Sequence, residues 1–287
     1  MIYTIKSNKI TVLINSFGAE LMSIKDINGA EYLWQGEKKY WKDRAPILFP
    51  YIARLTDNKY YIDNKCYSMN IHGFASNSEF QVVKLLEDEI TFSLKSNETT
   101  YKIYPRNFEL IITYKLIENK IEITFIVINN DNKTMYFGIG GHPGFLLNGN
   151  FEDYYLEFNE KCQPIRVGFN EKCFLNNKDE EFPLIDSKIL KLSHNMFDDD
   201  AIILYNTSKV ISIKNTKTNY TLTVSFKNMK YLGLWHMPKT DAPYICIEPW
   251  SSLPSREGII EVFEKQTNLL VLEKNKQYTN TWSIKIG

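Results

Sequence analysis

The chain has 287 residues, of which 44% are hydrophobic and 14% aromatic, and its 34 Lys and Arg residues equal its 34 Asp and Glu residues in number. This apolar content is enough to form a sizeable core and excludes an intrinsically disordered chain. A formal charge of zero gives no support to nucleic-acid binding, which usually shows as a basic excess or stripe.

Nothing in the sequence predicts an association with membranes. Residues 1–9 lack the apolar stretch of a secretory signal, and no apolar run approaches the length of a membrane span. We therefore expect a soluble, cytoplasmic protein. Its four cysteines are widely spaced and include no C-x-x-C pair, so we interpret them as free thiols rather than zinc ligands or disulfide partners: Cys66, Cys162, Cys173 and Cys246.

In chain order, alternating or short apolar runs bounded by turn residues predict strands throughout the first half. The run 121–128 is rich in β-branched residues, and similar runs precede and follow it at hairpin spacing. The predicted strands are 10–14, 31–34, 80–86, 89–94, 108–116, 120–129 and 133–139.

The second half continues the pattern, with 160–200 as its least regular segment. No long segment shows helical periodicity, and no P-loop, G-x-G-x-x-G motif or internal repeat is present. The sequence predicts an all-β protein, a large sandwich or distorted barrel formed by a single domain, 1–287. Its later strands are predicted at 201–205, 210–214, 220–226, 231–235, 244–248 and 277–286.

One carboxylate stands in an unusual place, at the end of the apolar strand 244–248. Strand alternation places Glu248 on the face of Tyr244 and Cys246, which is the less apolar face. An ionised group in apolar surroundings costs several kcal/mol unless it is paired or open to a pocket, so Glu248 is a candidate for chemistry. The alternative is a strand-end glutamate that faces solvent or bonds a backbone amide. Trp250 favours a site, because aromatic side chains near carboxylates hold sugars well.

Two of the four histidines lie beside glycines that shape the backbone into turns. His142 is flanked by Gly141 and Pro143, and His72 precedes Gly73. Together with Glu248 they would form an acid/base site that works near neutral pH. The competing interpretation for each is a buried histidine that bonds a backbone carbonyl. The contexts of the other two histidines, His194 and His236, indicate structural or peripheral positions.

Arg54 follows an apolar run and needs an acceptor, which a protein carboxylate or a ligand oxygen would supply equally well. Three acids precede the strand 201–205, and only one of them need face a site. They are Asp198, Asp199 and Asp200.

Taken together, five segments resemble the aldose 1-epimerase (galactose mutarotase) family, in particular its bacterial branch associated with lactose operons. The resemblance runs along nearly the whole chain, and the ordered set is far more specific than any one motif. The segments are 45–50 with Arg54, His72-Gly73-Phe74-Ala75, Gly141 to Phe145, Asp200-Ala201, and Cys246 to Trp250.

The resemblance implies a large antiparallel β-supersandwich of one domain that needs no cofactor or metal. It also implies that Glu248 is the general base for the anomeric hydroxyl and His142 the general acid for the ring oxygen. His72 would bond the ring-oxygen region, and Arg54 and Asp200 would bind sugar hydroxyls. The expected partner is a small monosaccharide, with no nucleic acid or membrane, and the protein would be a monomer or homodimer.

Several other functions stay open at this point. A hexose-6-phosphate mutarotase would need a cation for the phosphate, such as Arg44 or a nearby lysine. A glycosidase would need a second well-placed carboxylate, and a metalloenzyme would need His72, His142 and Glu248 to converge on an ion. A carbohydrate-binding protein without turnover is the alternative from another class.

Overall fold

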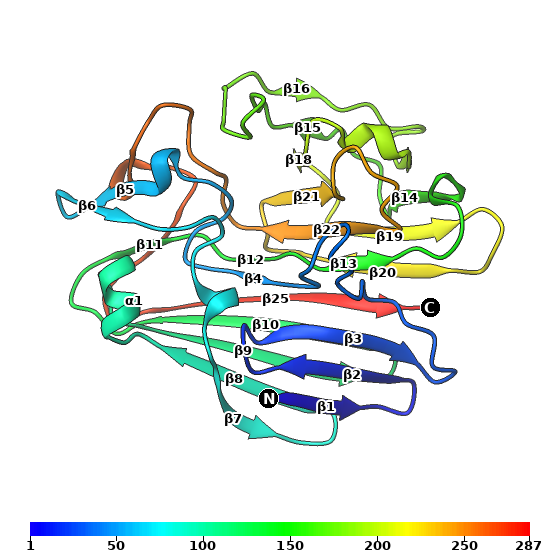
Figure 1. Ribbon diagram of the computed structural model, residues 1–287, viewed down its shortest axis with the longest axis horizontal. Coiled ribbons are helices and arrows are strands. Elements are labelled where there is room, and N and C mark those ends of the chain that lie inside the picture. Colours follow the sequence, from blue (N-terminus) through cyan, green and yellow to red (C-terminus); the bar gives the residue numbers. More distant parts are fainter.

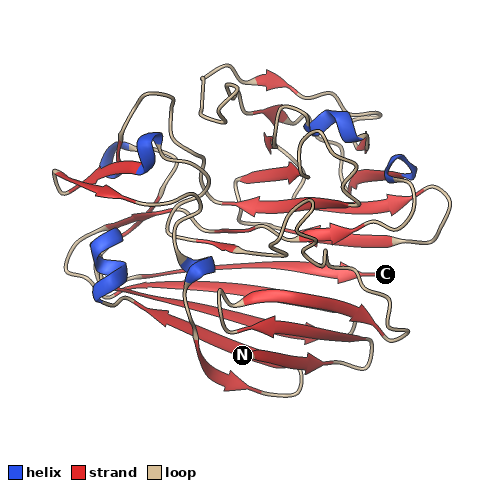
Figure 2. Ribbon diagram, viewed as in Figure 1, coloured by secondary structure: helices blue, strands red, loops and turns tan.

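The computed structural model describes all 287 residues and consists mainly of β-strands, with 46% of residues in strands and 8% in helices (Figures 1 and 2). This confirms the all-β prediction. The larger of two main sheets has nine strands. Their order is β17 (Ile189–Lys191), β14 (Tyr154–Phe158), β19 (Val210–Asn215), β20 (Thr221–Ser225), β25 (Gln277–Ile286), β10 (Lys120–Asn129), β9 (Phe108–Ile117), β8 (Glu89–Lys95) and β7 (Gln81–Leu85).

The second main sheet carries the segments singled out by the sequence, and its strands β18, β21 and β22 lie above β8, β9 and β10 in Figure 1. Its order is β16 (Glu180–Glu181), β15 (Ile165–Arg166), β18 (Ile202–Tyr205), β21 (Tyr231–Trp235), β22 (Tyr244–Trp250), β12 (Gly140–Gly141) and β4 (Ile47–Leu48), and β13 (Gly144–Leu146) also pairs with β22.

Smaller sheets and short helices complete the fold. The sheets are β1 (Ile2–Lys6), β2 (Ile10–Asn15) and β3 (Glu20–Asp26); β11 (Met135–Phe137) and β24 (Leu270–Leu272); and β23 (Glu261–Val262), β5 (Lys59–Ile62) and β6 (Lys65–Ser68). The helices are α1 (Glu98–Ile103) and five 3₁₀ turns, η1 (Thr56–Asn58), η2 (Ala75–Asn77), η3 (Phe151–Asp153), η4 (His194–Phe197) and η5 (Phe263–Lys265).

A continuous hydrophobic core lies between the two main sheets. Alternate residues of β10 are buried, including Ile123 and Phe125, as the period-2 pattern of its sequence requires. From the opposite sheet, Ile245 and Ile247 of β22 join the same core. Their neighbours in the strand point the other way, and this places Glu248 on the face away from the main core, as predicted.

The predicted strand 31–34 is wrong, because its residues make only isolated bridges at Glu31 and Leu33. The Glu31 carboxylate accepts hydrogen bonds from the backbone N–H groups of Ile24, Tyr32 and Leu33, at 2.7, 3.2 and 3.0 Å. The Glu31 side chain therefore satisfies backbone N–H groups that a neighbouring strand would otherwise bind. The predicted strand 133–139 is also shorter than expected, since only β11 forms within it.

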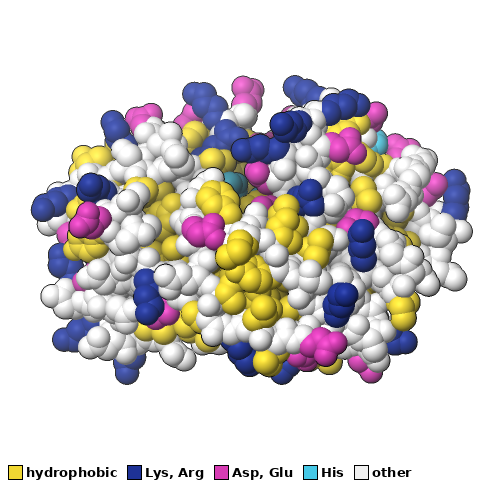
Figure 3. Space-filling model, turned by 60° about the horizontal axis from the view of Figure 1, so that its bottom comes forward, with side chains coloured by type: hydrophobic (Ala, Val, Ile, Leu, Met, Phe, Trp, Pro, Cys, Tyr) yellow, Lys and Arg dark blue, Asp and Glu magenta, His cyan; other side chains and the backbone are white.

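Charged side chains of both signs are interspersed over the face shown in Figure 3. Since Lys and Arg alternate with Asp and Glu there, that face carries no broad field of a single sign. None of the helices is long and apolar enough to cross a membrane.

Gly73 holds the loop that carries His72, and its replacement by alanine is expected to destabilise the protein by about 3 kcal/mol or more. Its φ is +77°, and an added Cβ would lie 2.2 Å from the carbonyl oxygen of Phe49. Gly149→Ala is the matched control, because Gly149 also has a positive φ but has no atom within 4 Å of an added Cβ. Urea unfolding of the two variants measures the difference, and equal losses would contradict the role of this close approach.

Candidate active site

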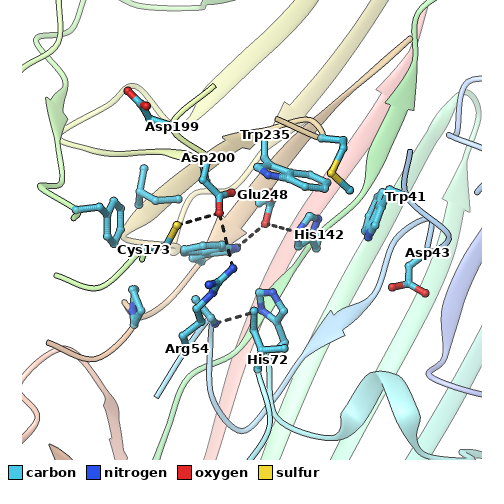
Figure 4. A pocket seen from close by; sticks show the side chains of 18 residues that line it. Trp41, Asp43, Arg54, His72, His142, Cys173, Asp199, Asp200, Trp235 and Glu248 are labelled. Carbon is cyan, nitrogen blue, oxygen red and sulfur yellow. Dashed lines mark hydrogen bonds and ion pairs between the residues drawn. The ribbon is translucent and has the colours of Figure 1, made fainter. Parts of the chain in front are cut away.

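A cavity of about 350 Å³ opens beside β21 and β22 (Figure 4). Its lining combines aromatic side chains with two histidines and several carboxylates. The residues are Trp41, Asp43, Ala53, Arg54, Ile71, His72, His142, Phe169, Cys173, Asp199, Asp200, Ala201, Ile203, Trp235, Met237, Glu248, Trp250 and Pro254. All six residues that the sequence proposed for the site line this one cavity.

Strand pairing places His142 opposite Glu248. Gly140 pairs with Trp250 and Gly144 pairs with Cys246, so His142, midway between the two glycines, lies beside Glu248 of β22. The Nε2 atom of His142 is 3.3 Å from Oε2 of Glu248. Two residues that are more than 100 positions apart in sequence thus form a close acid/base pair.

The glycines around His142 are required by packing. A Cβ on Gly141 would lie 2.7 Å from a ring carbon of Trp282, and a Cβ on Gly144 would lie 3.1 Å from atoms of Trp34 and Trp41. The turn therefore passes close to tryptophans, which leave no room for a side chain at position 141 and little at position 144. Its backbone N–H donates to the carbonyl of Pro46, 3.1 Å away, which further fixes the turn.

Burial shifts both members of the pair toward their neutral forms. It raises the pKa of Glu248 well above its usual value, and the N–H of Trp250, which donates to Oε2 at 3.1 Å, only partly opposes this. Burial lowers the pKa of His142 well below its usual value, with a further contribution from His72. Burial therefore favours a pair that shares one proton, with a neutral imidazole and a protonated carboxyl group, over the charged forms.

His72 is oriented as a hydrogen-bond donor to the cavity. The backbone N–H of Ala53 donates to its Nδ1 at 3.1 Å, so the proton of the neutral ring resides on Nε2. Burial, aided by the positive charge of Arg54, lowers the pKa of His72 to about 4, and the ring is therefore neutral at pH 7.

Arg54 and Asp200 meet across the cavity, with Nη2 and Oδ2 3.8 Å apart. The thiol of Cys173 donates to the same Oδ2 at 2.9 Å (Figure 4). Of the three candidate acids, Asp199 and Asp200 line the cavity and Asp198 lines a neighbouring groove. The choice of Asp200 over its neighbours agrees with its contact to Arg54.

Trp41 and Trp235, which were not predicted as site residues, form an aromatic wall beside His142. The rings of Trp41 and His142 are 4.9 Å apart at 32°, and Trp235 meets the same imidazole edge-on at 5.6 Å. A signal for Trp41 existed, because Tyr40 and Trp41 are two aromatic residues within the otherwise charged run 37–44. Cys173 was missed as well, and nothing in its local sequence distinguishes it.

Comparison with known proteins identifies the family of this chain. The family model described as aldose 1-epimerase matches residues 1–285. The chain belongs to the aldose 1-epimerase family. Protein LacX of Lactococcus lactis, in its chromosomal form, is 35% identical to it, with 96% of this chain and 97% of that protein aligned.

Two solved structures from lactobacilli share the fold of this family member over its whole length. A galactose mutarotase related enzyme from Lactobacillus acidophilus has a TM-score of 0.95 and 33% identity, and the match covers 97% of that chain. A galactose mutarotase-like protein from Lactobacillus casei has the same TM-score, 29% identity and full coverage of both chains. The predicted galactose mutarotase-like sandwich is therefore confirmed.

The four cysteines of this epimerase-family chain are free, as predicted. Arg44, considered as a phosphate-binding cation, does not line the cavity. Its guanidinium donates instead to the carbonyl of Met22 and to Oε1 of Gln35. That assignment of Arg44 was wrong, because its side chain is engaged in joining neighbouring backbone segments.

His236 predicts a pH dependence of stability. Burial lowers its pKa to about 4 with a further contribution from His194, while the hydrogen bond from its ring to the carbonyl of Met237 and the charge of Asp198 oppose the shift. Because the unfolded imidazole has a pKa near 6.5, its contribution to stability is present above that pH and is lost as pH falls toward about 4. Urea unfolding between pH 7 and 4 should show a shallower decline for His236→Gln than for the wild type, whereas identical slopes would exclude this contribution.

Proposed function

We propose that this protein interconverts the α and β anomers of an unphosphorylated aldohexose such as galactose or glucose. The observation that carries the proposal is the buried pair of His142 and Glu248, 3.3 Å apart at a cavity walled by tryptophans. The reaction moves a proton from one oxygen and delivers a proton to another oxygen of the same sugar, which suits an adjacent acid and base. Aromatic walls suit the apolar C–H faces of a pyranose ring.

The reactive form has the shared proton on Nε2 of His142 and an ionised Glu248. Glu248 takes the proton of the anomeric hydroxyl, the electron pair of that O–H bond forms the C1 carbonyl, and the bond from C1 to the ring oxygen breaks. His142 protonates the ring oxygen as it leaves, so the open-chain aldehyde is neutral. Rotation about the C1–C2 bond and reclosure with the roles reversed deliver the other anomer.

The remaining polar groups suit substrate positioning. His72 presents an Nε2–H donor to the ring-oxygen region, while Arg54 and Asp200 offer charge-assisted hydrogen bonds to hydroxyls. Asp200 receives the thiol proton of Cys173 in a hydrogen bond, and this orients its carboxylate toward Arg54. His72, Arg54 and Asp200 would therefore together restrict the orientation of the bound sugar.

The charges around the cavity favour an unphosphorylated sugar over a hexose 6-phosphate. Arg54 is the only lysine or arginine among the lining residues, and it already faces Asp200. Asp43 and Asp199 line the same cavity and would repel a phosphate dianion. The neighbouring groove offers no positive excess either, since its Arg166, Lys178 and Lys239 lie among Glu171, Glu180 and Asp198.

Polarimetry of freshly dissolved α-D-glucose, α-D-galactose and their 6-phosphates tests the proposal. We expect the protein to accelerate the approach to anomeric equilibrium for the free sugars, with much weaker acceleration for the phosphates. Preference for a phosphate would support the hexose-6-phosphate mutarotase instead. Absence of acceleration with all four, together with sugar-dependent quenching of tryptophan fluorescence, would identify a carbohydrate-binding protein without turnover.

A further inference from the structure

A third metal-ligating side chain lies next to the acid/base pair. Cys246 precedes Glu248 by two residues in β22 and so points to the same face of the strand. Its Sγ, a ring nitrogen of His142 and a carboxylate oxygen of Glu248 all lie within 4.8 Å of one another. Cys246 and Glu248 are almost fully buried, at 0% and 1% exposure, and they are held in the paired part of a sheet.

We propose that these three side chains bind a thiophilic divalent cation, with Zn²⁺ as the type case, and that the bound ion blocks the site. Imidazole nitrogen, thiolate sulfur and carboxylate oxygen are the three ligand types that Zn²⁺ takes, at about 2.0 to 2.3 Å. Two ligands about 2.0 Å from one tetrahedral ion lie roughly 3.3 Å apart. Nε2 of His142 and Oε2 of Glu248 are 3.3 Å apart, so these two atoms already have the spacing that a shared ion requires.

The surroundings leave a fourth position for solvent. His142 and Glu248 line the cavity, whereas Cys246 is not among the lining residues. An ion held by the three would therefore face the cavity on its remaining side, and a water molecule or a sugar hydroxyl would complete its coordination. A thiolate ligand disfavours Mg²⁺ and Ca²⁺, which prefer oxygen ligands.

The second thiol near the cavity lacks these properties. The thiol of Cys173 donates a hydrogen bond to the carboxylate of Asp200, and that carboxylate also faces the positive charge of Arg54 at 3.8 Å. A cation placed there would be repelled by the guanidinium. Cys173→Ser is therefore a matched control for Cys246→Ser, since both remove one buried or half-buried thiol beside the same cavity.

Metal binding has a direct consequence for proton transfer. Coordination takes the lone pairs of His142 and Glu248 that would otherwise accept protons, so the proton shared by this pair and the thiol proton of Cys246 are both released to water. The ion would thus inhibit mutarotation, and this consequence rests on the proposed function. Metal binding does not depend on the proposed function, because it involves only the three side chains.

Cobalt(II) titration monitored by absorption tests the binding without any sugar. We expect one equivalent to produce a thiolate-to-cobalt charge-transfer band in the near ultraviolet, and one equivalent of Zn²⁺ to abolish it. Cys246→Ser should lose the band and lower the affinity by more than about 100-fold, because even groups that only orient a ligand cost 10 to 100-fold. Cys173→Ser should retain the charge-transfer band and the wild-type affinity for cobalt.

Two results would overturn the proposal. One is the absence of a saturable one-to-one complex, and the other is a band that disappears in Cys173→Ser and persists in Cys246→Ser.

A second variant keeps the test independent of the folding of Cys246→Ser. His142→Gln retains the thiol, so it should keep some charge transfer while its affinity for cobalt falls, and unchanged affinity would exclude His142 as a ligand. Polarimetry with Zn²⁺ then tests the consequence, with inhibition expected in the wild type and at least tenfold weaker inhibition in Cys246→Ser. If the protein is no mutarotase, the cobalt result stands unaffected.

Discussion

Replacement of Glu248 by glutamine is expected to lower the rate of mutarotation by about 10² to 10⁴-fold while sugar still binds. The amide has nearly the shape of the carboxylate and can still meet the N–H of Trp250 through its oxygen. It cannot accept the proton of the anomeric hydroxyl. The affinity for sugar depends on groups that the substitution leaves in place, among them His72, Arg54 and the tryptophan walls.

Polarimetry gives the rate of this variant, and tryptophan fluorescence gives its sugar affinity. Undiminished turnover in Glu248→Gln would exclude Glu248 as the base. Loss of both turnover and sugar binding would indicate a structural role. The wild-type rate should also fall on the acid side only at a pH below the usual histidine pKa of about 6.5, where the pair takes up a second proton, since burial lowers the pKa of His142.

The same substitution should stabilise the protein at alkaline pH. A carboxyl group whose pKa is higher in the folded state loses stability as pH rises from its unfolded pKa toward its folded one. Glu248→Gln removes that penalty, so its stability advantage should grow as pH rises above about 4.3. Glu261→Gln is the contrasting control, because that buried carboxylate is paired with Arg256 at 2.8 Å and its loss leaves the guanidinium without its partner. Thermal unfolding at pH 5 and pH 8 measures both differences.

The second large effect is expected for His142→Gln, with a decrease in kcat of about 10² to 10⁴-fold. A glutamine amide can donate a hydrogen bond to the ring oxygen, but it carries no proton that it can transfer. Because the loss arises in the chemical step, kcat should fall much more than KM changes. The turn itself is fixed by Gly141, Gly144 and the bond to Pro46, so the substitution should leave the fold unchanged.

His194→Gln is the matched control for this second prediction. His194 is half-buried, stacks on Phe151 and does not line the cavity, so its replacement should leave kcat near the wild-type value. Steady-state mutarotation kinetics compare the two variants. Equal effects of the two substitutions would assign the loss to general disturbance rather than to proton transfer by His142.

Much of the sheet structure was predictable because burial on one face leaves a period-2 pattern. The hairpin of β9 and β10 follows that pattern for ten residues in each strand, and β10 was predicted with its observed ends. The strand 31–34 was predicted wrongly because a hydrophobic pattern does not reveal that Glu31 satisfies the neighbouring backbone. The six-residue helix α1 was missed, since its length is too short to show periodicity.

The site was predictable where a residue conflicted with its local surroundings, as Glu248 does in an apolar strand and His142 does between glycines. Their convergence was an expectation from family resemblance, because strand register over more than 100 residues cannot be read from one sequence. The aromatic wall shows the same limit, since Trp41 reaches His142 only through the folded loop. The catalytic and binding roles themselves remain predictions for the variants to test.

The position of β25 in the nine-stranded sheet has a consequence for synthesis of the chain. Residues 277–286 form the fifth of nine strands and pair with β10 on one side and β20 on the other. On a ribosome, where earlier segments fold first, the two halves of this sheet cannot join until these residues have emerged. Until then the facing edges of β10 and β20 have no partner and are open to pairing with other chains. The complete sheet should accordingly form in one late step during translation rather than build up gradually with chain length.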